Sequence, residues 1–197
     1  TNPSNGDDSL KVATTSWVYD NMLAADGSST FSGDLLPTTD SAFDLGSATF
    51  KWANVYADTL NGTAVEALYA DLAERFEADA AYEVGTVVAL GGSKEITAAS
   101  EEGSTDVFGV VSGRAAYLMN SGAGDNSTHP AIAMTGRVPV RVVGTVLKGQ
   151  RLIASNIPGV ARAAQPDEVN SFNVIGRSLV DKLTQEEGTV LAVVKIN

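Results

Sequence analysis

The sequence predicts a mainly β protein in two parts: an acidic extended stalk with short helices over residues 1–80, and a compact β-barrel or sandwich head over residues 81–197. Two observations predict this division. Residues 1–80 hold 13 Asp and Glu against three Lys and Arg, whereas residues 81–197 hold 11 against 10. The second part also consists of short Val-rich stretches separated by Gly, Pro, Asn or Ser, a spacing typical of barrels and sandwiches.

The first elements of the stalk are short and weakly apolar. Asp8 or Ser9 is a suitable N-cap for a helix over residues 10–23, where apolar side chains recur at helical spacing. After a loop of Gly and Ser, residues 31–36 predict a short strand that Pro37 ends.

Two later segments of the stalk leave the type of element open. In residues 50–60, Trp52 and Tyr56 have helical spacing, but Phe50 and Trp52 have strand spacing. The apolar pattern of residues 63–78 favours a helix, with a strand around residues 72–76 as the alternative.

In the head, the sequence predicts a series of strands rich in β-branched residues. The predicted strands are 86–90, 95–98, 107–112, 131–135, 138–143, 151–154, 174–178 and 189–196. Pro139 has no N–H group, so its strand is expected to lie at a sheet edge or to carry a bulge. An exposed edge needs a cover, and a partner subunit would supply one.

Composition excludes several kinds of site. The chain has no cysteine, so it forms no disulfide and has no thiolate ligand or nucleophile, and it has a single histidine, His129. The net charge of −11 argues against nucleic acid and against an anionic membrane surface as partners. No run of about 18 apolar residues is present to span a membrane. Because the chain starts with Thr1 rather than Met, we expect it to be a fragment or a processed product.

Several short motifs resemble parts of bacteriophage fibre proteins. SAFDLGS (41–47) followed by KWANVYA (51–57) resembles a repeat of bacteriophage tail fibres, and LKVATTSWV (10–18) is similar to another tail-fibre element. DLAERFE (71–77) and FGVVSG (108–113) resemble the peptidase G2 domain, the autocleaving intramolecular chaperone of some phage appendage proteins. That resemblance continues in GRVPV (136–140), GQRLI (149–153) and VIGRSL (174–179).

The resemblance implies a virion structural protein, the C-terminal part of a fibre or appendage with a contribution to host attachment, assembled as an intertwined parallel homotrimer. Its expected partners are copies of itself, other virion proteins and a host surface glycan. The stalk lacks apolar residues for a core of its own, so its larger side chains are expected to pack between subunits. The predicted trimer interface is formed by Leu10, Trp17, Phe50, Trp52 and Tyr56.

Two other functions stay open. An autoproteolytic trimerisation chaperone would need an acid or base beside a strained bond, and Glu74, Glu77 and Asp79, with Arg75 among them, are the candidate side chains. In the alternative interpretation, these side chains form a solvated acidic surface. We therefore assign no catalytic residue and expect that the protein is not an enzyme. The third function is a carbohydrate-binding module, in which Trp17, Trp52 and Tyr56 would stack on sugar rings.

The remaining polar motifs predict a loop with a recognition role and no cofactor or metal site. The loop at residues 120–130 is the candidate receptor-binding surface, since loops on a rigid scaffold carry recognition. Its candidate residues are Asn120, Asp125, Asn126, Thr128 and His129. Asp40, Asp44 and Asp58 match no calcium-binding loop, and turns explain them better. Ser112 lacks the glycine spacing of a nucleophile elbow.

Overall fold

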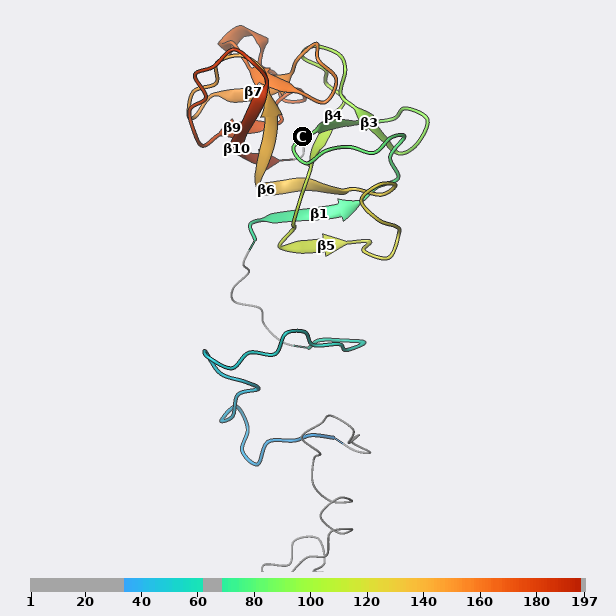
Figure 1. Ribbon diagram of the computed structural model, residues 1–197, viewed down its shortest axis with the longest axis vertical. Coiled ribbons are helices and arrows are strands. Elements are labelled where there is room, and N and C mark those ends of the chain that lie inside the picture. The colour runs from blue at the N-terminus through green and yellow to red at the C-terminus, as the bar shows by residue number, and fades with distance from the viewer. Residues whose placement is uncertain (1–33, 62–68, 196–197) are drawn as a thin grey trace, which may run out of the picture. The chain divides into compact units, whose positions relative to one another are not determined.

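The structure, a computed structural model, describes residues 34–61 and 69–195 of the chain (Figure 1). The chain forms two compact units, Thr1–Asn61 and Gly62–Asn197. The division therefore lies before residue 62 rather than at the predicted residue 80. The predicted helix over 10–23 lies outside the described residues.

Residues 34–61, the described part of the first unit, contain no helix or strand, and every side chain there is exposed. The strand predicted over 31–36 is therefore wrong for residues 34–36. The regular feature is a turn, in which Ser47 N donates to Phe50 O and Ser47 Oγ accepts from Phe50 N. Because no strand pairs with this segment among residues 34–61, its backbone stays solvated there.

The second unit is mainly β. Its strands are β1 (Asp71–Arg75), β2 (Val87–Leu90), β3 (Ile96–Ala98), β4 (Val107–Val111), β5 (Tyr117–Met119), β6 (Ala131–Val142), β7 (Arg151–Ala154), β8 (Ala161–Ala163), β9 (Gly176–Ser178) and β10 (Gly188–Lys195), with a 3₁₀ turn, η1 (Pro166–Glu168). All ten strands belong to one sheet. Each of the eight predicted head strands overlaps an observed one, and β5 and β8, three residues each, were not predicted.

Five strands close into a barrel in the order β6–β8–β7–β9–β10, because β10 pairs with both β9 and β6. Val138, Val140 and Val142 on β6 point into this barrel and are buried. On β10 the matching inward residues are Val190, Ala192 and Val194. The residues between them are half-buried on β6 and exposed on β10, so the period-two pattern of each strand has one fully buried apolar face. Burying a valine fully contributes about 1.5–3 kcal/mol, so this core supplies much of the stability of the head.

β6 is one continuous strand of 12 residues where two strands were predicted. Its first half pairs with β1 and β4, and its second half pairs with β10. Gly136 lies at the change of partner with φ +113°, and a Cβ there would overlap Ala70 O and lie 2.6 Å from Asp71 Cα. Glycine therefore allows β1 to cross closely over β6 without breaking the strand.

Pro139 lies inside β6 opposite Leu191 of β10. The backbone N–H groups of Arg137 and Arg141, which point to the same side as the Pro139 nitrogen, donate to the loop carbonyls of Ala70 and Gly85. That side of the strand faces loops rather than a ladder at this point. The missing N–H therefore costs no ladder hydrogen bond, which agrees with the local edge that the sequence predicted.

The helix favoured for residues 63–78 is wrong over residues 69–78, because Asp71–Arg75 forms β1. β1 is antiparallel to β6 on one side and parallel to β5 on the other. Its pairing partners lie 45 to 65 positions away in sequence, and a local apolar pattern does not indicate such pairing.

A second, smaller core is formed by side chains of β2, β3, β4 and β6 and of the segment that follows β1. Phe76 and Phe108 meet edge to face with ring centroids 5.0 Å apart, a geometry that stabilises by about 0.5–1.5 kcal/mol beyond the buried area. Ile96 and Ile132 are fully buried against them. In the part of the chain that the structure describes, no helix is long and apolar enough to cross a membrane.

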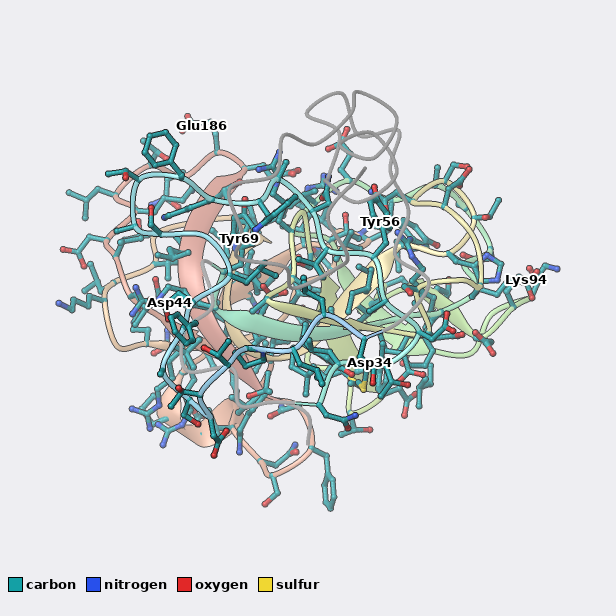
Figure 2. The ribbon with its side chains drawn as sticks, turned by 90° about the horizontal axis from the view of Figure 1, so that it is seen from below. Asp34, Asp44, Tyr56, Tyr69, Lys94 and Glu186 are labelled. Carbon is teal, nitrogen blue, oxygen red and sulfur yellow. The ribbon has the colours of Figure 1, made fainter. Side chains whose placement is uncertain are left out.

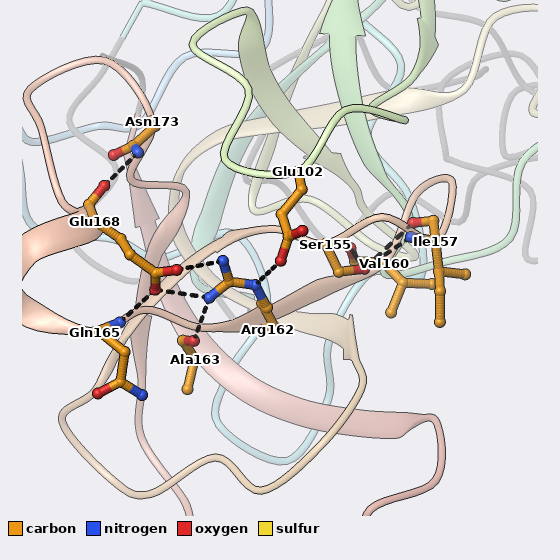
Figure 3. A network of polar contacts seen from close by, with 9 residues as sticks. All are labelled: Glu102, Ser155, Ile157, Val160, Arg162, Ala163, Gln165, Glu168 and Asn173. Carbon is orange, nitrogen blue, oxygen red and sulfur yellow. Dashed lines mark hydrogen bonds and ion pairs between the residues drawn. The ribbon is translucent and has the colours of Figure 1, made fainter.

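An ion-pair network holds η1 against the barrel (Figure 3). Arg162 on β8 donates from Nη1 and Nη2 to the two oxygens of Glu168 at 2.8 and 2.7 Å, and from Nε to Glu102 at 2.7 Å. Glu168 also accepts from Gln165 N at 2.7 Å, and its carbonyl accepts from Asn173 Nδ2. A bidentate pair with further donors favours the ionised carboxylate.

These contacts predict a loss of stability in acid that depends on Glu168. The hydrogen bond from Arg162 is the main reason why the pKa of Glu168 falls from 4.5 to about 2. A lowered folded-state pKa stabilises the fold fully above the unfolded value, and this contribution disappears as pH falls from 4.5 towards 2. In Glu168→Gln, thermal unfolding should therefore vary less with pH across this window, with a lower melting temperature at pH 7.

The matched control is Asp167→Asn, which removes the adjacent carboxyl, exposed and without an ion pair among the described residues. Its melting temperature should follow that of the native protein from pH 7 to pH 2. Equal pH profiles for Glu168→Gln and the native protein would contradict the assignment.

Candidate functional site

The most unusual polar side chain of the head is Asp71, the first residue of β1. It is 4% exposed, and its Oδ2 atom is buried with no hydrogen-bond partner. An isolated buried carboxylate is costly, because burial in an apolar environment disfavours the charged form. In a folded protein, such a group is either a destabilising feature that the rest of the fold offsets or a residue with a functional role.

Three backbone contacts position Asp71. Gly136 on β6 lets the Ala70–Asp71 backbone approach closely, and the Ala70 carbonyl accepts from Arg137 N at 3.1 Å. Asp71 O accepts from Ala116 N at 2.8 Å, which ties the start of β1 to the segment before β5. The carboxyl is thus held by β-sheet pairing on both sides rather than by a flexible loop.

A cavity of about 410 Å³ opens beside the Asp71 carboxyl. Ser112, Arg114 and Arg137 contribute to its wall, together with the ring of Tyr69, which is labelled in Figure 2. Ser112 is 5% exposed. Arg114 Nη1 donates to the Tyr69 hydroxyl at 2.8 Å, so this guanidinium lines the cavity without pairing with a carboxylate. The cavity therefore combines one buried acid, one hydroxyl and two guanidinium groups.

Burial raises the pKa of Asp71, and hydrogen bonds from the Ser112 hydroxyl and from its own backbone N–H offset part of this rise. Asp71 therefore holds a proton more readily than an exposed aspartic acid. A carboxyl of this kind can act as a general acid or base toward a group within hydrogen-bond reach. The hydroxyl of Ser112 and the backbone around residue 70 are the groups at hand.

The carboxylates that the sequence suggested for acid–base chemistry do not converge. Glu77 pairs with Lys94 at 2.8 Å, and Asp79 accepts a short hydrogen bond from the Tyr82 hydroxyl. Both contacts lower the pKa of the acid concerned. Arg75 turns away toward the 120–130 loop, and its Nη1 donates to Asn126 Oδ1 and His129 O. These partners explain the side chains as structural contacts of the surface.

Asp71 itself was not among the predicted acids. A strand interpretation of DLAERFE would have placed Asp71 and Ala73 together on the buried face, since side chains alternate along a strand. The helical interpretation hid this alternation. A buried acid at an inward strand position was the signal available in the sequence.

The 120–130 loop is held in place by its own polar groups. Asp125 Oδ1 accepts from the backbone and hydroxyl groups of Ser127 and Thr128. Asn120 Nδ2 donates to Arg75 O at 3.1 Å, and His129 Nδ1 lies 3.1 Å from Thr128 Oγ1. Many hydrogen-bonding groups of the loop are thus already bonded to other groups of the head. The receptor-binding role of the loop stays a prediction.

The predicted interface residues of the first unit are exposed in the single chain. Phe50, Trp52 and Tyr56 are 80%, 64% and 91% exposed, and Tyr56 is labelled in Figure 2. Leu10 and Trp17 lie outside the described residues. Within residues 34–61 and 69–195, no three Asp, Glu or His side chains are grouped closely enough to hold a metal ion.

Comparison with known proteins shows a shared fold. No protein-family profile and no curated protein sequence matches the chain. A crystal structure of the C-terminal fragment of bacteriophage phi29 gene product 12 matches 64% of this chain and 100% of that fragment, with a TM-score of 0.47 and 18% identity. A crystal structure of the pre-mature bacteriophage phi29 gene product 12 matches 70% of this chain, with a TM-score of 0.52 and 16% identity. The match spans 23% of the length of that second protein, and at this identity the likeness is one of fold.

Proposed function

We propose that this chain is a structural protein of a bacteriophage virion, the C-terminal part of a homotrimeric fibre or appendage. The observation that carries the proposal is the fold that the chain shares with pre-mature phi29 gene product 12. The tail-fibre motifs SAFDLGS and KWANVYA support the same interpretation from the sequence, independently of the head.

The first unit supports assembly with other copies. Leu36, Phe43, Phe50, Tyr56 and Leu60 are each at least 66% exposed in the single chain. An apolar surface this dense is rare on monomeric soluble proteins and marks an interaction surface. Three copies wound around one axis would bury these side chains against each other.

Light scattering of the full chain at micromolar concentration tests the assembly. The expected mass is three times the chain mass of 20.4 kDa. A stable monomer would overturn the trimer. Antibodies against the head, applied to intact particles, then locate the chain, and their failure to label any particle of the phage would overturn the role in the virion.

The second candidate function is autoproteolysis by an intramolecular chaperone, and the buried Asp71 favours it. The acid lies at the start of β1 beside Ser112 and has an oxygen without a partner among the described residues. When water attacks the carbonyl carbon of a peptide bond beside Asp71 and the C–N bond breaks, proton donation from Asp71 to the nitrogen would assist the departure of the amine. The resemblance of DLAERFE to peptidase G2 supports this candidate.

Mass spectrometry of a longer chain, extended upstream of Thr1, tests this second candidate. Spontaneous cleavage near residue 71 is expected in the native chain and should fall by a factor of about 10²–10⁴ in Asp71→Asn. Glu77→Gln, which removes a carboxyl paired with Lys94 on the surface, is the control and should cleave at the native rate. An intact native chain would overturn the candidate.

A further inference from the structure

Four cations without an ion-pair partner share one face of the barrel. Between residues 69 and 195, most Lys and Arg side chains bind a carboxylate, a hydroxyl or a carbonyl group. Examples are Lys94 with Glu77, Arg141 with Glu187 and Lys182 with Gly144 O. Among the Lys and Arg residues from 69 to 195, the side chains that make no hydrogen bond or ion pair are those of Arg137, Lys148, Arg151, Arg177 and Lys195. Of these, all but Lys148 lie on the outer face of β6, β7, β9 and β10.

The strand register aligns three of these cations in a row across the barrel. Arg151 on β7 is opposite Arg177 on β9, Arg177 is opposite Val193 on β10, and Val193 is opposite Arg137 on β6. Neighbouring strands lie about 4.8 Å apart. Arg151 and Arg177 are therefore about 5 Å apart at the backbone, and Arg137 lies about 10 Å further along the row.

Like charges directly opposite each other on neighbouring strands destabilise a sheet. Here the pair Arg151 and Arg177 persists in a chain with 24 Asp and Glu and a net charge of −11. No carboxylate of the described residues compensates the pair. An anion that binds between the two guanidinium groups would remove the repulsion, and guanidinium groups bind oxyanions in a bidentate manner.

A hollow of about 590 Å³ lies beside this row. Arg151, Arg177 and Lys195 line it, and so do Thr135, Asn170 and Ser171. The Oδ1 atom of Asn170 accepts from Phe172 N and Asn173 N, which fixes the amide and leaves its Nδ2 group available to a ligand. Small-molecule sites have this size, with a few polar groups at set positions.

We propose that this hollow binds an acidic oligosaccharide, with a sulfate, phosphate or carboxylate group held between Arg151 and Arg177. The remaining polar side chains, Thr135, Asn170 and Ser171, would bind sugar hydroxyl groups. An acidic segment of another copy of this chain fits the hollow less well, because residues 34–61 carry isolated aspartates rather than closely spaced anionic groups. The binding site is argued from the geometry of the head alone. Its role in recognising a host surface rests on the proposed function in the virion.

The test uses the full chain, a fully sulfated heparin disaccharide as the probe and isothermal titration calorimetry at low salt. We expect the native protein to bind the disaccharide more tightly than its unsulfated counterpart, which keeps only the uronate carboxylate. Arg151→Ala/Arg177→Ala should weaken binding about tenfold or more, because it removes charge-assisted hydrogen bonds. Arg151→Lys/Arg177→Lys keeps the charges but loses the bidentate geometry, so it should weaken binding by a smaller factor, and it decides the test if the alanine variant does not fold.

The control is Lys94→Ala/Lys148→Ala, which removes the same total charge from two residues of the second unit that do not line the hollow, and it should leave the Kd within about twofold. Three results would overturn the proposal: no binding by the native protein, an equal loss of affinity in the control, or inorganic sulfate binding as tightly as the disaccharide. Tighter binding of a synthetic peptide of residues 34–61 would assign the hollow to an acidic protein segment instead. Since trimer mass is measured separately, the proposed function and this binding site can fail independently.

Discussion

Gly136→Ala is expected to unfold the head or to lower its free energy of unfolding by about 3 kcal/mol or more. A residue other than glycine at φ +113° carries backbone strain of about 1–3 kcal/mol. The new Cβ would also overlap Ala70 O and lie 2.6 Å from Asp71 Cα. Both are backbone atoms, which cannot move without breaking the pairing of β1 with β6. Overpacking of this kind costs a further 1–3 kcal/mol, roughly, against a total stability of about 5–15 kcal/mol.

Urea denaturation, followed by far-ultraviolet circular dichroism, measures the effect. Gly122→Ala is the control, because a Cβ at Gly122 would meet nothing within 4 Å. Its unfolding midpoint should match that of the native protein. If Gly136→Ala shows the same midpoint as well, the close crossing of β1 over β6 is not the constraint that we describe.

Trp52→Ala is expected to dissociate the proposed trimer. The ring is 64% exposed in the single chain, so its truncation removes little from one subunit. In a trimer that buries the ring between copies, a large-to-small substitution costs about 3–5 kcal/mol for each ring. Light scattering should therefore show the trimer mass for the native protein and a shift towards the chain mass of 20.4 kDa for the variant.

The matched control is Tyr117→Ala on β5, an aromatic side chain of the second unit that is 65% exposed. Its truncation should leave the mass unchanged. A Trp52→Ala protein that keeps the trimer mass and the native melting temperature would show that the ring faces solvent in the assembly. The sugar-stacking alternative for Trp52 would then gain support.

The strands of the head were predictable because their signals are local. β-branched residues alternate on β6 and β10 with a period of two, and Gly, Pro or Asn separates the strands. Short strands such as β5 and β8 offer three residues each, too few for a period to stand out. The helix over 63–78 failed for a different reason: β1 is specified by its pairing with β6 and β5, which lie far along the chain.

The candidate sites were harder to predict than the strands, because their contacts come from segments that are far apart in the sequence. The sequence directed attention to Glu74, Glu77 and Asp79 because acids gather there, but their partners come from other segments, as Lys94 does for Glu77. Asp71 was overlooked because burial, rather than identity, makes it unusual. Burial depends on which strands cover a residue, and Gly136 permits that cover from 65 positions away.

By itself the sequence determined the β class of the head, the acidic character of the first part and the absence of thiol chemistry, because composition and local periodicity are properties of the chain alone. The tertiary structure decided which strands close the barrel and which side chains are buried, Asp71 among them. It also placed Arg151, Arg177 and Arg137 in one row across neighbouring strands. These three outcomes depend on strand register. A shift of one residue turns every side chain of a strand to the other face, and the register is fixed by contacts between residues far apart in the sequence.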